Sequence, residues 1–460
     1  MIQHYDILGQ HTPLRNAASL DHWNKMILAF LAHGAATPTH LGALLEAEPD
    51  FAMGHATKGL FCIMLGRVEM VDTAREALEA AQMARLSRPA NARENAFVTA
   101  LDVWLNGSPR GAIAAMEGIL LAAPEDTLAL KISHAIRFIL GDSTGMRRSI
   151  EAALPAYAPD HPARGYVLGC HAFALEETGD YARAETAGRR GLGLAPNDAW
   201  GLHAVAHVFD MTGNSKGGLN WLKGREGAWA HCNNFRYHVW WHKALMHLDQ
   251  GEIDVVLDLY DREVRADRTD DYRDISNGTS MLMRLELDGV DVGNRWEELA
   301  ELSANRAEDG CLIFADLHYL LALVDGNHDA AVTKLMGRMR RKASDGHCEG
   351  AAIAAHPGLA AAAGLEAFGE ADYAAAYINL AQARRMMPTI GGSHAQRDVF
   401  ERLTIDAAIR AGYLDEATAI LVDRAALRGG HEDHYAAVRH DLIERGRAAS
   451  LHHEMKIPAQ

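Results

Sequence analysis

Residues 165–198 read GYVLGCHAFALEETGDYARAETAGRRGLGLAPND, and this stretch decides the fold. Apolar residues recur at helical spacing up to Glu177, a turn follows at Gly179, and a second helical segment runs on from there. Ala172 and Ala184 are small residues where two antiparallel helices must touch, and Pro196 ends the second segment. The stretch therefore predicts one helical hairpin, in the tetratricopeptide pattern of about 34 residues.

The turn glycine of this hairpin recurs along the chain at intervals of 34 to 43 residues. Its occurrences are Gly66, Gly107, Gly141, Gly179, Gly213, Gly251, Gly289, Gly326, Gly369 and Gly412. Small residues recur in register with them, and no segment has the alternation of a strand. We therefore expect an all-α, tetratricopeptide-like solenoid of roughly ten helical hairpins, wound as a right-handed superhelix.

The repeat pattern also suggests three parts of the chain. Residues 1–50 are expected to form an N-terminal helical cap, residues 51–430 the solenoid, and residues 431–460 a C-terminal helical cap with a polar tail. Two linkers, 214–236 and 342–357, are longer than the pattern requires.

The amino-acid composition limits the kinds of molecule that we expect the chain to bind and the cell compartment in which we expect it. Lys and Arg number 45 against 61 Asp and Glu, so the net charge is −16, which predicts that nucleic acid is not a partner. The five cysteines are far apart and form no CxxC pair, which is typical of a reducing cytoplasm. The apolar run at 26–36 is too short to span a bilayer. We expect a cytoplasmic protein without a membrane partner, and a homo-oligomer is compatible with the pattern.

Histidines are concentrated on one predicted wall of the solenoid. In the repeat motif, positions 2, 5, 9, 12 and 13 of the first helix face the concave groove. Applied to repeats that begin at residues 199, 237 and 312, this register predicts a wall of Trp200, His203, His207, Asp210, His238, Trp241, the adjacent His242, and Asp316. Imidazoles, indoles and carboxylates thus share one surface.

Two histidines four residues apart on one helix can bind one metal ion, and a neighbouring helix can complete the site. The candidate metal ligands are His203, His207, His238 and His242, with Asp210 or Asp316 as a further ligand or outer partner. Nitrogen-rich ligation suits a transition metal such as zinc. Acid–base catalysis by neutral histidine and simple packing in a crowded groove are the alternatives.

A second group of polar residues lies in GGSHAQRDVF, 391–400. Ser393 followed by Gln396 predicts a capping box at the start of a helix. His394 and Arg397 also lie in this first turn, where free backbone N–H groups and the helix dipole favour an anion. The turn is therefore expected either to bind an anionic group of a ligand, through His394, Gln396 and Arg397, or to be a helix cap that is exposed to solvent.

The chain resembles the tetratricopeptide repeat protein 38 family. The resemblance lies in YVLGCHAFALEETGDYARAE (166–185), NDAWGLHAVAHVFDMTG (197–213), FRYHVWWHKALMHLDQGEIDVVLDLYDREV (235–264), VDVGNRW (290–296), FADLHYLLA (314–322) and IGGSHAQRDVF (390–400). Ala315 and Met283 depart from the family pattern, which has Asn and Trp there. The resemblance implies the fold and no particular reaction. The polar residues that fit its pattern are His203, His207, His238, His242, Asp316, His318, His394, Gln396 and Arg397.

Two classes of function follow. The first is a solenoid that binds a small molecule or peptide in the groove lined by His, Trp and Asp. The alternative is an enzyme, such as a metal-dependent hydrolase or a related acid–base catalyst, with its active site in that groove. A peptide binder needs an elongated open channel, whereas an enzyme needs a pocket with convergent polar groups.

Overall fold

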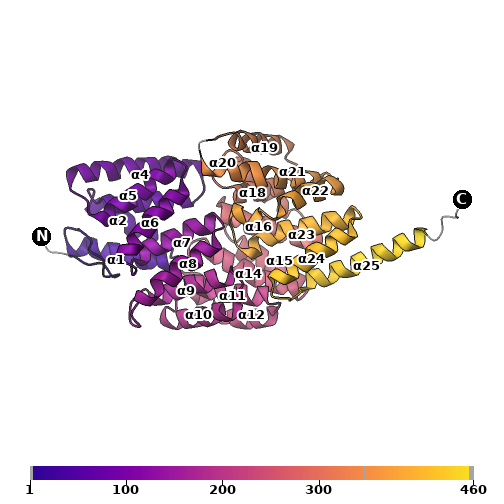
Figure 1. Cartoon of the computed structure of the whole chain (residues 1–460), viewed down its shortest axis with the longest axis horizontal. Coiled ribbons are helices and arrows are strands. Elements are labelled where there is room, and N and C mark those ends of the chain that lie inside the picture. The colour runs from indigo at the N-terminus through magenta and orange to yellow at the C-terminus, as the bar shows by residue number, and fades with distance from the viewer. Residues whose placement is uncertain (1–3, 347, 455–460) are drawn as a thin grey trace.

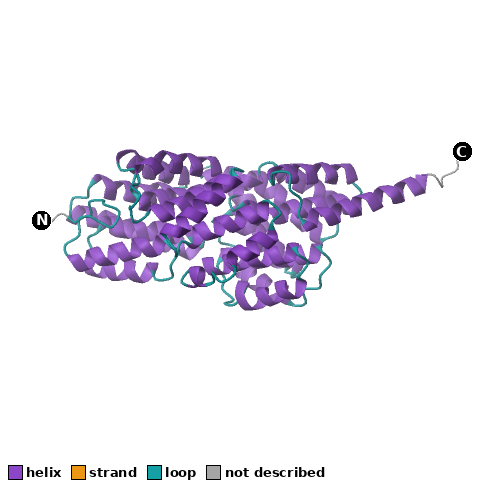
Figure 2. Ribbon diagram, turned by 90° about the horizontal axis from the view of Figure 1, so that it is seen from below, coloured by secondary structure: helices purple, strands orange, loops and turns teal. Residues whose placement is uncertain are grey.

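The computed structural model describes residues 4–346 and 348–454, and Figure 2 shows that this part of the chain is built from helices and loops. No strand occurs among these residues, where two isolated bridges join Tyr5 to His11 and Gly34 to Cys232. The predicted all-α solenoid of helical hairpins is therefore confirmed.

Ten antiparallel hairpins form the body of the part of the chain that the structure describes, and the two helices of each hairpin are joined by a short turn. Figure 1 shows how the helices are arranged from the N-terminus to the C-terminus. The pairs are α3 (Ala52–Met64) with α4 (Val68–Ser87), α5 (Ala92–Leu105) with α6 (Pro109–Ala122), α7 (Thr127–Ile139) with α8 (Ser143–Ala153), α9 (Arg164–Glu176) with α10 (Tyr181–Leu194), α11 (Ala199–Met211) with α12 (Ser215–Leu222), α14 (Phe235–Asp249) with α15 (Ile253–Leu259), α16 (Tyr272–Leu287) with α17 (Arg295–Arg306), α18 (Ile313–Asp325) with α19 (Asp329–Ala343), α21 (Leu359–Gly369) with α22 (Tyr373–Arg384), and α23 (His394–Arg410) with α24 (Leu414–Leu427).

Further helices flank and connect these pairs. They are α1 (Ala17–Leu31), α2 (Thr37–Ala47), α13 (Gly227–Ala230), α20 (Glu349–Ile353), α25 (His434–Glu454) and the short turns η1 (Leu154–Ala156), η2 (Tyr260–Val264), η3 (Ala354–Gly358) and η4 (Met387–Ile390). The predicted linker 214–236 contains α12, the second helix of a hairpin. The three-part division of the chain stays a prediction, and the end of the predicted tail, 455–460, lies outside the described residues.

The repeat signals have a direct structural counterpart. Each of the ten predicted glycines lies in the turn between the helices of one hairpin, or at the end of the first helix in the case of Gly369. Ala172 and Ala184 are fully buried where α9 and α10 meet. The capping box predicted at Ser393 and Gln396 is present at the start of α23. Local chemistry therefore determines where these helices begin and end.

The solenoid closes on itself, so that early hairpins contact late ones. The loop after α1 meets the loop before α14, because the Asn233 amide donates to the carbonyl of His33 (2.8 Å). Arg67, after α3, pairs with Asp270 before α16 at 2.8 Å. Glu349, at the start of α20, accepts from Ser108 at 2.6 Å.

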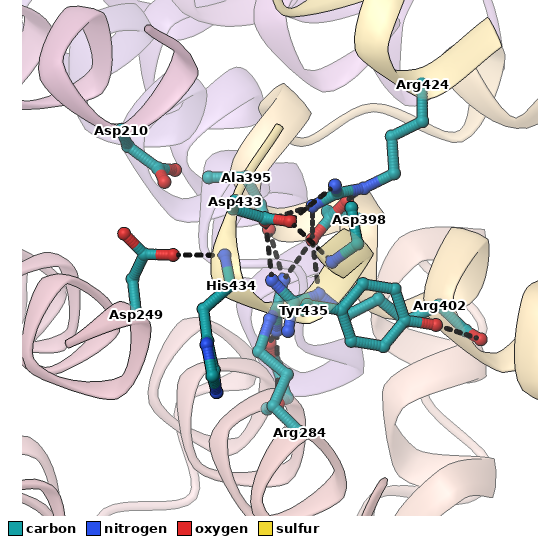
Figure 3. A network of polar contacts seen from close by, with 12 residues as sticks. Asp210, Asp249, Arg284, Ala395, Asp398, Arg402, Arg424, Asp433, His434 and Tyr435 are labelled. Atoms are coloured by element: carbon teal, nitrogen blue, oxygen red, sulfur yellow. Dashed lines mark hydrogen bonds and ion pairs between the residues drawn. The ribbon is translucent and has the colours of Figure 1, made fainter. Parts of the chain in front are cut away.

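The later hairpins continue this closure. Gly141 and Gly391 lie so close to the opposite segment that an added Cβ would come within 1.8 Å of the Pro388 oxygen and 2.2 Å of the Ile139 oxygen, respectively. Further on, the His434 amide, at the start of α25, donates to Asp249 at 2.9 Å (Figure 3). The concave side is therefore bounded by both halves of the chain.

One apolar segment, 349–369, is long enough to cross a membrane by length and composition, but half of its most apolar window is buried in the protein. It is not one straight helix, because the backbone at His356 is extended between α20 and α21. It packs against α18, α19 and α22 as part of the solenoid.

Candidate functional site

A cavity of about 1210 Å³ lies on the concave side, between the N-terminal and C-terminal halves of the chain. Helices α1, α3, α7, α14, α16 and α23 all contribute to its wall. Much of this wall is aromatic, and includes Phe30, Phe61, Phe138, Phe173, Trp200, Phe235 and Phe314. A cavity of this size and character suits a small organic molecule.

Lys131, on α7, brings a buried positive charge to this wall. Its side chain is 4% exposed, and its ammonium lies 4.6 Å above the Trp200 ring and 3.6 Å from the Cys170 sulfur. No carboxylate of the described residues lies within ion-pairing distance of it. Burial raises the pKa of the nearby Asp198 to about 7, so this carboxyl is only partly ionised at neutral pH. Lys131 is therefore a cation without a full counter-charge.

Two arginines of the wall have carboxylate partners. Arg67 and Arg273 pair with Asp270 and Asp271 at 2.8 Å and 2.6 Å. Lys131 thus differs from these two arginines in having no carboxylate partner.

Four histidines from two neighbouring helices converge below the cavity. His203 and His207 lie on α11, and His238 and His242 lie on α14. Their ring centroids are 4.2–5.1 Å apart in five of the pairs, and one ring nitrogen from each lies within 4.8 Å of the others. His203 and His238 also line the cavity. The structure therefore brings together the four predicted metal ligands.

Hydrogen bonds to outer acceptors orient two of these rings, and a third ring lies close to a carboxylate. His203 directs Nδ1 to the Trp200 carbonyl at 3.2 Å, and His238 directs Nδ1 to Asn277 Oδ1 at 3.0 Å. His207 Nδ1 lies 3.5 Å from a carboxylate oxygen of Glu176. With Nδ1 bound to an outer acceptor, His203 Nε2 has no hydrogen-bond partner among the described residues, and His238 Nε2 shares a hydrogen bond with His242 Nε2 at 3.1 Å.

Burial is the largest single influence on the pKa values of the four histidines. It lowers the pKa of His203 and His242 well below the usual range, and it lowers the pKa of His238 to about 3. Burial also acts to lower the pKa of His207, but the Glu176 carboxylate outweighs this and raises it. Three of the four imidazoles are therefore neutral at neutral pH, the form that binds a metal.

The structure places several predicted site residues away from the cavity. Asp316 pairs with Arg338 of α19 at 2.6 Å, and His318 directs Nδ1 to the Phe314 carbonyl at 2.8 Å. Asp210 lies 3.7 Å from Arg428, after α24. Trp241 is fully buried and stacks on His238 with ring centroids 5.3 Å apart. These four residues support the fold around the site and do not line the cavity.

The start of α23 holds an anion that belongs to the protein itself. The His394 amide donates to Glu177 Oε1 at 2.8 Å, and Arg397 lies 3.4 Å from Glu177 Oε2. Burial acts to raise the pKa of Glu177, but His394 and Arg397 outweigh it and hold that pKa below the usual range. The anion at this turn is thus Glu177, and Gln396 alone of the predicted trio lines the cavity.

Several residues of the site were not predicted, although the repeat register contains a signal for two of them. In a repeat that begins at residue 127, Lys131 occupies groove position 5, as His203 does in its own repeat. In the repeat that begins at residue 165, Glu176 occupies groove position 12. Asn277 does not fall on a groove position of its repeat, so only the tertiary structure identifies it.

No family model matches the chain. Similar solved structures include two of human IFIT1 dimers. The dimer with m7Gppp-AAAA has 12% sequence identity and a TM-score of 0.42, with 95% of this chain and 96% of that chain covered. The dimer with PPP-AAAA has 13% identity and a TM-score of 0.41, with 94% and 95% covered.

The prediction that nucleic acid is not a partner is contradicted by these two structures, which are of human IFIT1 with m7Gppp-AAAA and with PPP-AAAA. The physical error lies in the use of net charge. The charge of −16 belongs to the whole chain, whereas a ligand meets the local charge of a groove. Here the cavity wall includes the cations Lys58, Arg67, Lys131, Arg236 and Arg273.

Proposed function

We propose that this solenoid binds a small organic anion in its concave cavity, with the anionic group at Lys131 and an apolar body against the aromatic wall. The observation that carries the proposal is the position of Lys131. A buried ammonium without a carboxylate partner is costly, and a bound carboxylate or phosphate would supply the missing counter-charge.

The shape and lining of the cavity support a small molecule in preference to an extended peptide. Contacts between segments far apart in the sequence, such as those of His33 with Asn233 and of Arg67 with Asp270, make the wall continuous across the two halves of the chain. The His33 ring lies 4.5 Å from the Phe235 ring and 5.3 Å from that of Trp200, which gives one side of the cavity a flat aromatic surface.

A metal-dependent hydrolase or a related acid–base catalyst is the second candidate. It is supported by the four histidines, two of which line the same cavity that would hold the substrate. In this case Lys131 would position the substrate anion, and the reaction would take place at the histidine cluster.

Ligand binding can be tested with Lys131→Met, which keeps the length and apolar stem of the side chain and removes its charge. Phenylacetate and phenyl phosphate, as probes, are expected to stabilise the wild-type protein against heat and to give a Kd by calorimetry. The variant should bind about tenfold more weakly or worse, the equivalent of one lost charged contact. Lys216→Met, at an exposed lysine of α12, is the control and should bind as wild type does. Equal affinity in all three proteins would reject the proposal.

The finer family assignment and the location of the protein are proposals as well. Membership of the tetratricopeptide repeat protein 38 family is supported by the sequence blocks quoted above, which include all four histidines of the cluster. A cytoplasmic location is supported by five cysteines that form no disulfide.

A further inference from the structure

The histidine cluster has the spacing of a metal site. The Nε2 atoms of His238 and His242 are 3.1 Å apart and share a hydrogen bond. In a tetrahedral zinc site with Zn–N bonds of about 2.0–2.1 Å, neighbouring ligand atoms lie about 3.3–3.4 Å apart. All four ligand atoms are within 4.8 Å of one another, so small side-chain rotations would bring them onto one ion.

The surroundings of the cluster match those of metal-bound histidine. A metal-binding imidazole usually donates its other N–H to a carbonyl, amide or carboxylate oxygen, which sets its tautomer and orientation. Trp200 O and Asn277 Oδ1 are such partners of His203 and His238, and a carboxylate oxygen of Glu176 lies 3.5 Å from His207 Nδ1. The acceptors come from α9, α11 and α16, so the cluster is held from several sides.

Packing alone does not account for this arrangement. His203 Nε2 and both ring nitrogens of His207 are buried and have no hydrogen-bond partner in the described part of the chain. Glu176 is fully buried, and neither of its carboxylate oxygens meets hydrogen-bond geometry there. Buried polar atoms without partners are unfavourable, and an ion bound by the imidazoles would satisfy the inward-facing nitrogens.

We infer that His203, His207, His238 and His242 bind one transition-metal ion of the zinc class, with Glu176 and Asn277 as outer partners that orient His207 and His238. Nitrogen ligands of this kind select zinc, nickel, copper or iron and discriminate against magnesium and calcium, which prefer oxygen. Because His203 and His238 also line the cavity, the ion lies at its floor. A contact between this ion and a bound anion rests on the proposed function, whereas the metal site itself does not.

The direct test is elemental analysis of the full-length protein, purified without chelator and with any polyhistidine tag removed. We expect about one equivalent of zinc or a related metal per chain. After the metal is removed by a chelator, addition of Co²⁺ alone should produce visible absorption bands that saturate at about one equivalent. A wild-type protein with well under one equivalent of metal and no cobalt bands on titration would overturn the inference.

Variants separate the ligands from the neighbouring residues. His207→Asn should lose the metal and the cobalt bands while it keeps the helical circular dichroism signal. His171→Asn is the matched control, because His171 is also buried and also contacts a carboxylate, that of Glu151 at 3.3 Å, but lies outside the cluster. It should keep its metal. Loss of metal in both variants, or in neither, would contradict the assigned ligand set.

Asn277→Ala tests the outer partners. It should weaken Co²⁺ binding by about tenfold and leave the number of sites unchanged, because it removes only the acceptor for His238 Nδ1. If Asn277→Ala binds Co²⁺ as tightly as wild type, the role of Asn277 is refuted.

The metal inference and the proposed function fail in different ways. Lys131→Met should keep its metal and lose affinity for phenylacetate, since Lys131 is not a ligand of the cluster. Metal without anion binding would refute the proposed function alone. Anion binding without metal would refute this inference alone.

Discussion

At the residue scale, Glu177 shows how a ligand-like site can be filled by the protein. The start of α23 combines free backbone N–H groups, His394 and Arg397, which together favour a negative charge. Glu177 supplies that charge from α9's end, more than two hundred residues earlier in the chain. The same contact holds the backbone next to Glu176, which faces His207. Arg397 therefore helps to hold Glu177, the residue that follows Glu176 in the chain.

Arg397→Ala should destabilise the protein by about 3 kcal/mol, because it leaves the buried Glu177 carboxylate without its cation. The side chains of Arg397 and Glu177 are 11% and 3% exposed. Arg183→Ala is the control: Arg183 contacts Asp180 and Glu151 but is 56% exposed, so its loss should cost under about 1 kcal/mol. Urea unfolding measures both free energies. Similar losses in the two variants would show that Glu177 does not depend on Arg397.

At the scale of the helical element, the turn glycines have two different roles. Gly179 takes a positive φ of 79°, and a Cβ added there would meet no heavy atom of another part of the chain within 4 Å. Gly141 has a positive φ of 66° as well, but it also lies directly against the backbone at Pro388. The repeat pattern requires the first property, and only contact between distant hairpins requires the second.

Alanine substitution at these two glycines should therefore lower the free energy of unfolding by different amounts. Gly179→Ala should cost about 1–2 kcal/mol, the strain of a left-handed backbone with a side chain. Gly141→Ala should cost more, roughly 3 kcal/mol or above, because its Cβ would lie 1.8 Å from the Pro388 oxygen and would force the two segments apart. The comparison uses urea unfolding followed by circular dichroism. Equal losses of stability in the two variants would mean that residues 388–391 can move away from residue 141 at little cost in free energy.

At the scale of the whole molecule, buried ion pairs attach the C-terminal helices to the closed solenoid. Asp433, before α25, accepts hydrogen bonds from Arg424 at 2.6 Å and from Arg402 at 3.2 Å. Asp398 accepts from both of these arginines at 2.7 Å (Figure 3). Next to this network, Arg284 of α16 donates to the Ala395 carbonyl at 2.6 Å. These contacts join α23, α24 and α25 to one another and to the centre of the chain.

This network predicts sensitivity to acid. Burial alone would raise the pKa of Asp433, but Arg424 and Arg402 outweigh it and hold that pKa below the usual range. The stability that Asp433 contributes is therefore complete above the ordinary carboxyl pKa and is lost as the pH falls through the folded-state pKa. Asp433→Asn should lower stability by about 2–3 kcal/mol at about pH 7, and its difference from wild type should shrink towards about pH 3. Urea midpoints measured across this range test the expectation, and a constant difference would contradict it.

The sequence by itself determined the helical elements. Each hairpin depends on signals within about 34 residues: apolar spacing, small residues at the contact, a turn glycine and caps such as Ser393 with Gln396. Because these interactions are local, the register also predicted that His203, His207 and His238 share one side of the solenoid. The same register, applied to the repeats at 127 and 165, contains Lys131 and Glu176.

Only the tertiary structure decided which distant residues meet. The closure of the solenoid depends on the small rotation between each hairpin and the next, which accumulates over ten hairpins. No short stretch of sequence predicts this total rotation. It turned the expected groove into a cavity bounded by both halves of the chain. The tertiary structure also placed Glu177 against the start of α23, Asp316 against Arg338, and Asn277 against His238. Local spacing thus determines the helices and the face that each side chain occupies, whereas the accumulated superhelical rotation determines the partners that the side chain finds there.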